Sequence, residues 1–168
     1  MTAIELSSGT PVEVTVSPST PEGLCRLVAE QRADIVVFGS DYRTAAGHVS
    51  PQNSAWALLE GGTAAVAIAP ANYRSNREAE VHRIGVLATP GDDATIETAR
   101  HLADRFDAVV SRDEHRVDLL VVGSRGEAPE GQVMLSSQFQ HEIENAGCPV
   151  LVLPRGARIQ FSSQIYVA

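Results

Sequence analysis

Short runs of apolar residues, each bounded by glycine, proline or charged residues, recur along the chain. Continuous apolar runs of four to eight residues are typical of strands buried on both faces of a parallel sheet. Two further stretches predict less buried strands: residues 12–17 (VEVTVS), which alternate, and residues 107–111 (DAVVS), which are short. The apolar runs are residues 33–38 (ADIVVF), 64–69 (AAVAIA), 83–88 (RIGVLA), 117–122 (VDLLVV) and 149–154 (PVLVLP).

Between these runs, apolar residues recur every three or four positions, which predicts amphipathic helices. Thr20 is expected to cap the first helix, with Pro21 at its first position, and Ser50-Pro51 to cap the second. The expected helices and their buried residues are 20–31 with Leu24, Leu27 and Val28, 51–60 with Trp56, Leu58 and Leu59, 92–106 with Ile96, Ala99, Ala103 and Phe106, and 136–145 with Leu135, Phe139 and Ile143.

Strands that alternate with helices predict an α/β fold, a parallel sheet with flanking helices. One connection does not fit this fold. Only residues 112–116 separate the short strand 107–111 from the strand that begins at Val117. A parallel crossover takes about a dozen residues and normally a helix. Either strand 107–111 therefore pairs antiparallel, or the middle of the domain has been lost.

Two parts of the chain match each other at one constant offset. Nine residues between positions 34 and 70 recur without a gap between positions 118 and 154. The matches fall on strand ends, loop and helix alike, which indicates two copies of one structural unit. The matching residues are Asp34, Val37, Gly39, Ser40, Gly47, Val49, Glu60, Val66 and Pro70, and their counterparts are Asp118, Val121, Gly123, Ser124, Gly131, Val133, Glu144, Val150 and Pro154.

The length and composition are those of a globular protein. A chain of 168 residues can bury a core in one domain or in two small ones. No apolar run approaches the roughly 20 residues that cross a bilayer, and the N-terminus lacks a signal pattern. Cys25 and Cys148 are far apart and each has apolar neighbours, so both are expected to be packing residues. We expect a cytoplasmic protein with reduced thiols.

The charged residues exclude several classes of function. A net charge of −8 argues against a nucleic-acid partner, because binding the phosphate backbone needs clustered cations. All 13 basic residues are arginine, which excludes a phosphate-binding P-loop lysine and Schiff-base chemistry. The five histidines show no metal-ligand spacing, and no Ser-His-Asp arrangement or carboxylate pair stands out. We therefore expect neither a metal site nor an enzyme.

The strand at residues 117–122 is followed directly by a loop whose backbone amides and hydroxyl groups could bind a ligand. Gly123 and Gly126 allow a sharp turn with outward-pointing amides, and Ser136-Ser137 open the next helix. Ligands of parallel sheets bind beyond the carboxyl ends of the strands. Amides of the turn and of the helix start, with the two hydroxyls, would present donors to a phosphate. Alternatively, the glycines only permit a tight turn and Ser136 only caps the helix.

The sequence G-x-x-G, nine residues, a small pair before a helix and a Cys-Pro-Val-Leu-Val strand resembles the C-terminal half of a universal stress protein domain. That family usually has glycine followed by serine or threonine at the small pair, so Ser137 fits and Ser136 departs. The resemblance implies an adenine-nucleotide-hydrolase-like fold with five parallel strands in each unit, of which each copy here keeps a part. It divides the chain into a first unit at residues 1–71 that lacks the first strand and helix, a linker at 72–81, a second unit at 82–156 with an abridged middle, and a tail at 157–168.

Many members of that family bind ATP, so the resemblance implies a site for ATP, with Mg²⁺, in the second unit. Three features oppose such a site. First, family members that bind ATP have an aspartate where alignment places Thr89. Second, the loop carries Glu127 and Glu130 against Arg125 alone, with Asp92-Asp93 expected nearby, and these negative charges would repel a triphosphate. Third, Ser136 adds a Cβ where glycine would let the backbone approach phosphate closely. In the first unit, Gly39, Tyr42, Gln52 and Asn53 take the motif positions, where Tyr42 and Gln52 would fill the cradle. The implied binding residues are Val122, Gly123, Arg125, Gly126, Ser136, Ser137 and Thr89.

In the same family the final strands of two units pair antiparallel across a two-fold axis. Residues 64–69 and 150–153 are the equivalents here, so we expect either an internal pseudo-dimer or a homodimer through these strands. The expected function is that of a regulatory or interaction protein of the stress response whose nucleotide binding is weakened or lost. The alternative is an ATP-binding universal stress protein that uses the loop from Gly123 to Ser137. A nucleotide hydrolase of a related fold is disfavoured, because the H-x-G-H and S-G-G-x-D-S signatures are absent.

Overall fold

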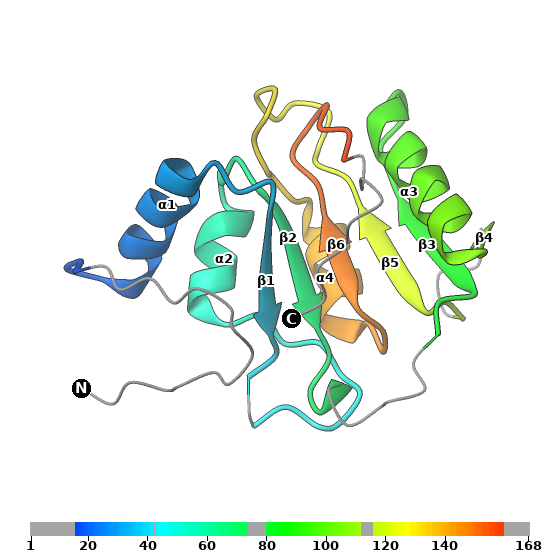
Figure 1. The fold of residues 1–168 in the computed structure, drawn as a ribbon, viewed down its shortest axis with the longest axis horizontal. Coiled ribbons are helices and arrows are strands. Elements are labelled where there is room, and N and C mark those ends of the chain that lie inside the picture. The colour runs from blue at the N-terminus through cyan, green and yellow to red at the C-terminus, as the bar shows by residue number, and fades with distance from the viewer. Residues whose placement is uncertain (1–15, 42, 74–79, 112–115, 160–168) are drawn as a thin grey trace.

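One twisted sheet carries the fold, with helices on both of its faces (Figure 1). The computed structural model describes residues 16–41, 43–73, 80–111 and 116–159. Within these ranges the sheet has six strands in the order β1-β2-β6-β5-β3-β4. In chain order the elements are α1 (Thr20–Gln31), β1 (Ile35–Gly39), α2 (Asn53–Leu59), β2 (Ala65–Ala69), β3 (Arg83–Leu87), α3 (Asp93–Phe106), β4 (Val109–Ser111), β5 (Leu119–Val122), α4 (Ser137–Asn145) and β6 (Val150–Val152).

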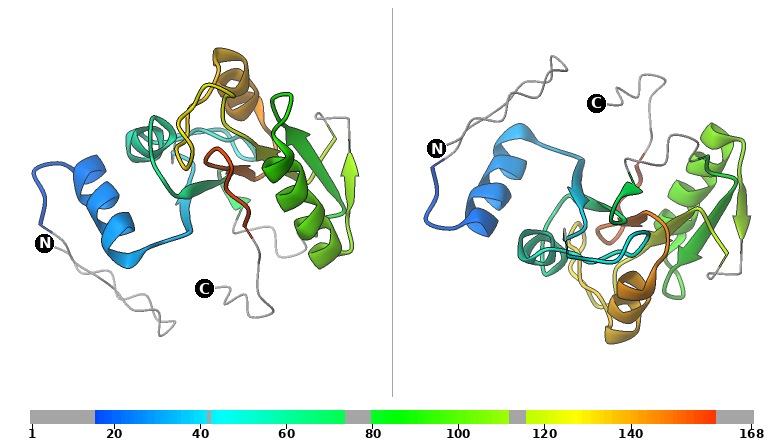
Figure 2. Two further views of the ribbon diagram at one scale, coloured as in Figure 1. Left: turned by 90° about the horizontal axis from the view of Figure 1, so that it is seen from above. Right: turned by 90° about the horizontal axis from the view of Figure 1, so that it is seen from below.

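The helices cover the two faces of the sheet unequally. Helices α2 and α4 lie on one face and α3 lies on the other (Figure 2). Leu58, Leu59 and Ile143 pack on the first face in a core that includes residues of β2, β5 and β6. On the second face, Ala99 and Leu102 of α3 belong to a separate core that includes residues of β3 and β5. The α/β architecture that the alternating pattern predicted is confirmed.

The strands β2 and β6 pair antiparallel in the middle of the sheet. Ala67 lies opposite Leu151, and these two residues occupy equivalent positions of the sequence repeat. Every other strand pair of the described sheet is parallel. The two strands for which the family resemblance implied a pairing are therefore neighbours within a single chain. The directions of β1 and β5 are opposite to one another.

The loops on either side of this pair follow the same backbone path. We call residues 34–73 the first segment and residues 118–157 the second segment. Six loop hydrogen bonds of the first segment recur between the counterpart residues of the second. Gly47 and Gly131 also share a positive φ, of 81° and 77°. The paired bonds, given as donor to acceptor, are Asp41 N to Ser50 O and Arg125 N to Met134 O, Thr44 N to Asp41 O and Ala128 N to Arg125 O, Gly47 N to Ala71 O and Gly131 N to Arg155 O, His48 N to Ala45 O and Gln132 N to Pro129 O, Ala71 N to His48 O and Arg155 N to Gln132 O, and Tyr73 N to Pro70 O and Ala157 N to Pro154 O.

The two segments also hold each other through reciprocal bonds. The amide of Val49 donates to the carbonyl oxygen of Ala146 at 3.2 Å, and the amide of Val133 donates to that of Gly62 at 2.9 Å. Val133 is the repeat counterpart of Val49, and Ala146 is the counterpart of Gly62. Each loop is thus fixed by the helix end of the opposite segment.

The pairing of β4 excludes one of the two alternatives for the short connection before β5. β4 pairs parallel to β3, and β5 pairs parallel to β3 on the other side, so the antiparallel alternative is wrong. The short connection is sufficient because of where the two strands lie along β3. The last residue of β4 pairs with Gly85, and the first residue of β5 pairs with Ile84, the neighbouring position of β3. The end of β4 and the start of β5 are thus almost level along β3, so the connection need not span the length of a strand. Gly85 leaves room for the crossing, because a Cβ there would lie 3.1 Å from the side chain of Val117.

Two helix starts differ from the expected ones. Ser19, not Thr20, caps α1, and its hydroxyl accepts the amide of Glu22 at 3.4 Å. The N-cap of α2 is Gln52, because Ser50 belongs to the preceding loop, where its amide donates to Ser40 Oγ. These shifts move each helix boundary by one or two residues, as is usual for boundaries inferred from sequence.

Some expected packing residues lie closer to solvent. Leu24 and Leu27 are half-buried, and Cys25 is exposed, because α1 packs against α2 at the edge of the molecule and touches no strand broadly. Phe106 is 42% exposed; it is the last residue of α3, and the described sheet has no strand beyond β4 to cover it. The expected strand at 12–17 lies mostly outside the described residues, and its last two residues, Val16 and Ser17, are not in a strand. Most of the linker, the tail and Tyr42 also lie outside them.

Candidate functional site

Two adjoining hollows open where β3 and β5 end, at the carboxyl edge of the strands. The first has a volume of about 560 Å³ and the second about 430 Å³. Val122 and Gly123, which the sequence also predicted as binding residues, are buried beneath them. The other five predicted residues all line the first hollow: Thr89, Arg125, Gly126, Ser136 and Ser137.

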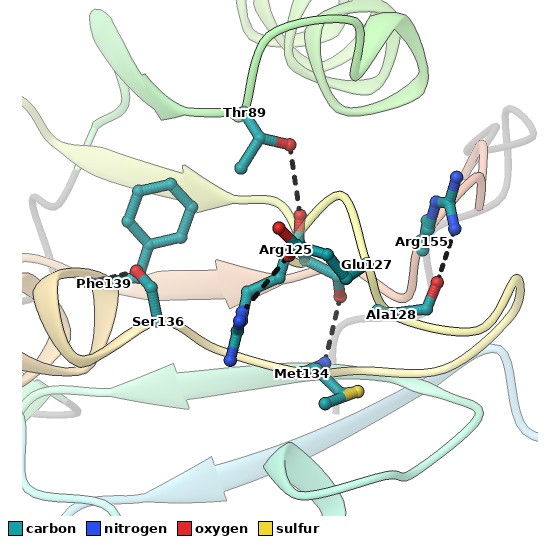
Figure 3. Close-up of polar contacts among 9 residues, drawn as sticks. Thr89, Arg125, Glu127, Ala128, Met134, Ser136, Phe139 and Arg155 are labelled. Carbon is teal, nitrogen blue, oxygen red and sulfur yellow. Dashed lines mark hydrogen bonds and ion pairs between the residues drawn. The ribbon is translucent and has the colours of Figure 1, made fainter.

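Ser124 fixes the loop that forms the floor of these hollows. Its hydroxyl lies 2.8 Å from the carbonyl oxygen of Leu153 and accepts the amide of Met134 at 3.4 Å. The carbonyl of Ser124 in turn accepts the hydroxyl of Thr89 at 3.4 Å (Figure 3). Ser124 is 2% exposed, so these bonds form away from water. In the sequence Ser124 stands out only as a repeat match, and nothing there indicates this role.

A carboxylate occupies the space above Gly123. A Cβ at position 123 would lie 2.0 Å from Asp92 Oδ2 and 2.6 Å from Thr95 Oγ1. The same carboxylate caps α3, because Asp92 accepts the amide of Thr95 at 3.2 Å and its hydroxyl at 2.6 Å. Gly123 is therefore required for the close approach of a helix cap. This requirement is independent of any phosphate.

The start of α4 is also capped from within the chain. Ser136 has an extended backbone, and its hydroxyl accepts the amide of Phe139 at 3.1 Å (Figure 3). Ser137 is the first residue of the helix and is exposed. Of the amides in the first turns of α3 and α4, one in each helix is thus already bonded to a side chain. A bound anion would compete with these caps or use the amides that they leave.

Three arginines, not one, lie at this edge. Arg125 pairs with Glu127 at 3.4 Å, and Arg155 donates to the carbonyl oxygen of Ala128 at 2.6 Å (Figure 3). Arg155 lines the second hollow together with Arg158, which bonds Glu97. The sequence pattern pointed to Arg125 alone, because Arg155 and Arg158 follow β6 and are distant from the loop in the sequence. The carboxylates that line the hollows are Asp92, Asp93, Glu127 and Glu130.

The equivalent edge of the first segment is built differently. Gln52 Nε2 donates to the carbonyl oxygen of Gly39 at 3.4 Å, so the side chain lies across the turn as the sequence predicted. A Cβ at Gly39 would meet no atom of the described residues within 4 Å. No residue of the described chain takes the place that Asp92 has above Gly123.

Cys148 lies at the opposite edge of the sheet, near the amino end of β6. Burial, with a smaller contribution from the nearby charge of Asp118, raises the pKa of its thiol to about 11. Burial also raises the pKa of Tyr73, with smaller contributions from Cys148 and Asp118. A thiol that stays protonated at neutral pH is a packing residue, as the sequence predicted.

The described residues show two further negative results. In the ranges given above, no three His, Cys, Asp or Glu side chains are grouped so that they could hold a metal ion. No helix in the same ranges has the length and apolar character that crossing a membrane requires.

Comparison with known proteins places the chain in a family. No curated protein matches it. The model of the universal stress protein family matches residues 59–154, which is more than half of the chain. The matched region runs from the end of α2 to the residues just after β6. It contains all the residues that line the first hollow, and all those that line the second except Arg155, Gly156 and Arg158. The chain belongs to the universal stress protein family.

Proposed function

We propose that this protein is a regulatory or interaction protein of the stress response in which nucleotide binding is weakened or lost. The observation that carries the proposal is the Asp92 carboxylate above Gly123. A triphosphate bound at the Gly123–Gly126 turn would face this charge at close range, and like charges in a partly buried site repel strongly. Thr89, where relatives that bind ATP have an aspartate, turns its hydroxyl to Ser124 and leaves the adenosine end without a carboxylate.

The partners of the arginines support the same conclusion. Arg125, Arg155 and Arg158 each already bond a carboxylate or a carbonyl of the chain. An incoming phosphate would have to replace these partners, and it would gain only the difference between the two sets of bonds. No arrangement in the hollows points to a nucleophile or a general base, so the proposal is non-catalytic.

Thermal unfolding with and without Mg-ATP tests the proposal. A ligand at 100 times its dissociation constant stabilises a protein by about 2.7 kcal/mol. We expect the melting midpoint to stay unchanged at millimolar Mg-ATP. A midpoint that rises with the wild type, and does not rise with Arg125→Ala, would show that the loop binds nucleotide and would overturn the proposal.

The second candidate is an ATP-binding universal stress protein. The observation in its favour is that Thr89, Arg125, Gly126, Ser136 and Ser137 line one hollow. Nucleotide carried through purification distinguishes the two candidates. The protein is denatured with acid and the supernatant is analysed for adenine nucleotides by chromatography; a stoichiometric amount would favour this second candidate.

We also propose that the first and second segments are two abridged universal-stress units that form a pseudo-dimer within one chain. The antiparallel β2–β6 pair, centred on Ala67 and Leu151, supports this, because it relates the segments by a local two-fold axis. The same axis relates the hydrogen bond of Val49 to that of Val133, because their donors and acceptors are counterparts in the two segments. The pair fills the strand edge through which separate units would otherwise associate.

A further inference from the structure

No strand of the described residues pairs with the outer edge of β1. β1 is the last strand on its side of the described sheet, and β2 is its only neighbour there (Figure 1). Val37, in the middle of the strand, is 72% exposed. A row of unpaired backbone groups beside an exposed valine is a template for a further strand. The second segment has such a strand, because β5 is the counterpart of β1 and β3 pairs with the outer edge of β5.

The counterpart valine is fully covered. Val121 of β5 is 0% exposed, because β3 pairs along its outer side and α3 packs over the same face. The ladder pairs Val86 with Val121 and Leu87 with Val122. Val37 and Val121 are identical residues at equivalent positions of strands that share their loop geometry. Their difference in exposure arises from one strand and one helix.

The aspartates that precede the two strands differ in the same way. Asp118 Oδ2 accepts the amides of His82 and Arg83, both at 2.9 Å, so it holds the first residues of β3. Asp34, its counterpart, is exposed. Its carboxylate has no hydrogen bond or ion pair to any described residue. An acceptor for the start of a strand is therefore present beside β1 without the strand.

The glycines that follow the two strands show the third difference. The absence of a Cβ at Gly123 leaves the space that the Asp92 carboxylate, the cap of α3, occupies. Gly39 has open space at the same place, and its φ is not positive. No contact with a described residue and no positive φ requires glycine at position 39. Its absent side chain leaves room for a helix cap like that of α3.

We infer that the outer edge of β1 is a docking site for a strand–turn–helix element of a partner protein. The element adds as a parallel strand beside residues 35–38, in the register of β3 on β5. Two of its first backbone amides bind Asp34, an apolar side chain covers Val37, and a short capping side chain of its helix lies above Gly39. The identical counterparts of these three residues are the ones that contact β3 or α3 in the second segment.

A second copy of this chain does not fit the role. Its own β3–α3 is already paired with its β5, so lending this element would uncover as much apolar surface as it buries. The partner is a protein that presents a free element of the β3–α3 type. Because β3 begins with His82 and Arg83 beside Asp118, a basic residue at the start of the partner strand is expected beside Asp34. This inference goes beyond the proposed function and holds whether or not the protein binds nucleotide.

A synthetic peptide of residues 80–106 of this chain, labelled with a fluorophore, serves as the probe. Its binding to the full-length protein is followed by fluorescence anisotropy. We expect saturable binding that Val37→Lys abolishes. Asp34→Ala should weaken it about tenfold, the loss expected for hydrogen bonds to a charged acceptor. Gly39→Leu should abolish it while leaving the melting midpoint of the free protein near that of the wild type, since open space surrounds that position.

Val109→Lys is the matched control, because Val109 is 61% exposed on the opposite edge strand. Binding that survives Val109→Lys and is lost with Val37→Lys supports the inference. Binding equally sensitive to both would show non-specific adhesion, and binding that survives Val37→Lys would place the peptide elsewhere, for example on β5 in place of β3. Either result overturns the inference, as does the absence of saturable binding to correctly folded protein. Self-association that depends on Val37 and resists competition by the peptide would overturn it in favour of a second copy.

Discussion

Gly39 and Gly123 illustrate how the same residue acquires different energetic roles from its surroundings. The two glycines follow equivalent strands, yet only the second touches a helix cap. Ser40 and Ser124 share a role instead: each hydroxyl lies between a carbonyl oxygen at the end of the neighbouring strand and the amide of a loop residue. At the residue scale, sequence identity therefore predicts shared function only where the contacts are shared as well.

The glycine pair gives the first prediction. Gly123→Ala should lower the free energy of unfolding by about 1–2 kcal/mol, the usual cost of losing an N-cap, because the new Cβ displaces Asp92 from α3. Gly39→Ala should leave stability unchanged or raise it by up to about 1 kcal/mol through a less flexible unfolded chain. Urea unfolding of both variants measures the difference. Equal losses would contradict the contact between Asp92 and Gly123.

The cysteines give the second prediction, at neutral and alkaline pH. Cys25 is exposed and Cys148 is buried with a pKa of about 11, so one thiol per native chain should react with a disulfide reagent at pH 8 and both after denaturation. Cys25→Ser should remove the native reaction and Cys148→Ser should leave it.

The raised pKa of Cys148 also affects stability. The folded protein favours the protonated thiol, so this contribution is fully present below the ordinary thiol pKa of 9.0 and is lost as the pH rises towards about 11. Stability should therefore fall over that range, and Cys148→Ser should lessen the fall. A pH profile that is identical for the variant and the wild type would contradict the assignment.

At the scale of elements, each loop depends on the opposite segment. The loop after β5 bonds to Gly62 at the end of α2, and the loop after β1 bonds to Ala146 at the end of α4. Helix and loop of different segments thus form one packed layer above the β2–β6 pair. The candidate site on the second loop is held in shape by residues of the first segment.

The serine pair tests this loop geometry. Ser124→Ala should destabilise the protein by about 1–3 kcal/mol, because Met134 N and Leu153 O lose a buried partner. Ser40→Ala should cost less, about 0.5–1.5 kcal/mol, because Ser40 is only half-buried and water can replace its hydroxyl. Thermal unfolding compares the two variants. A larger loss for Ser40→Ala would contradict the burial that distinguishes them.

At the scale of the whole molecule, the direction of the strands decides how the chain associates. The antiparallel β2–β6 pair lies inside the sheet, so the strands that would join two separate units are already paired. In the described sheet the edge strands are β1 and β4, which carry the exposed valines Val37, Val109 and Val110. Association, where it occurs, is expected at these edges.

Solution mass tests this arrangement. Light scattering after size-exclusion chromatography should give a monomer of 17.9 kDa at micromolar concentration, because the central edge is satisfied internally. A stable dimer that dissociates when β6 is altered by Leu151→Asp, with the protein remaining folded, would show instead that the pairing forms between chains.

The sequence by itself determined the elements and the correspondence between segments. The buried strands follow from short apolar runs, and α4 begins where Ser136 was expected to cap it, because capping and burial act over a few residues. The constant offset of the repeat anticipated the equivalent loops, since the same local sequence favours the same turns. Five of the seven predicted binding residues line one hollow, but the family resemblance implied their grouping, since Thr89 follows β3 and is distant from the others in the sequence.

Only the tertiary structure decided which groups face those residues. Asp92 above Gly123, and Arg155 and Arg158 beside the second hollow, come from elements distant in the sequence, so no local pattern could predict their contacts. The parallel pairing of β4 depends on Gly85 leaving room for Val117, which is a matter of side-chain volume between strands. The open edge of β1 was equally hidden, because exposure at Val37 depends on which strand lies beside it and not on the residue itself.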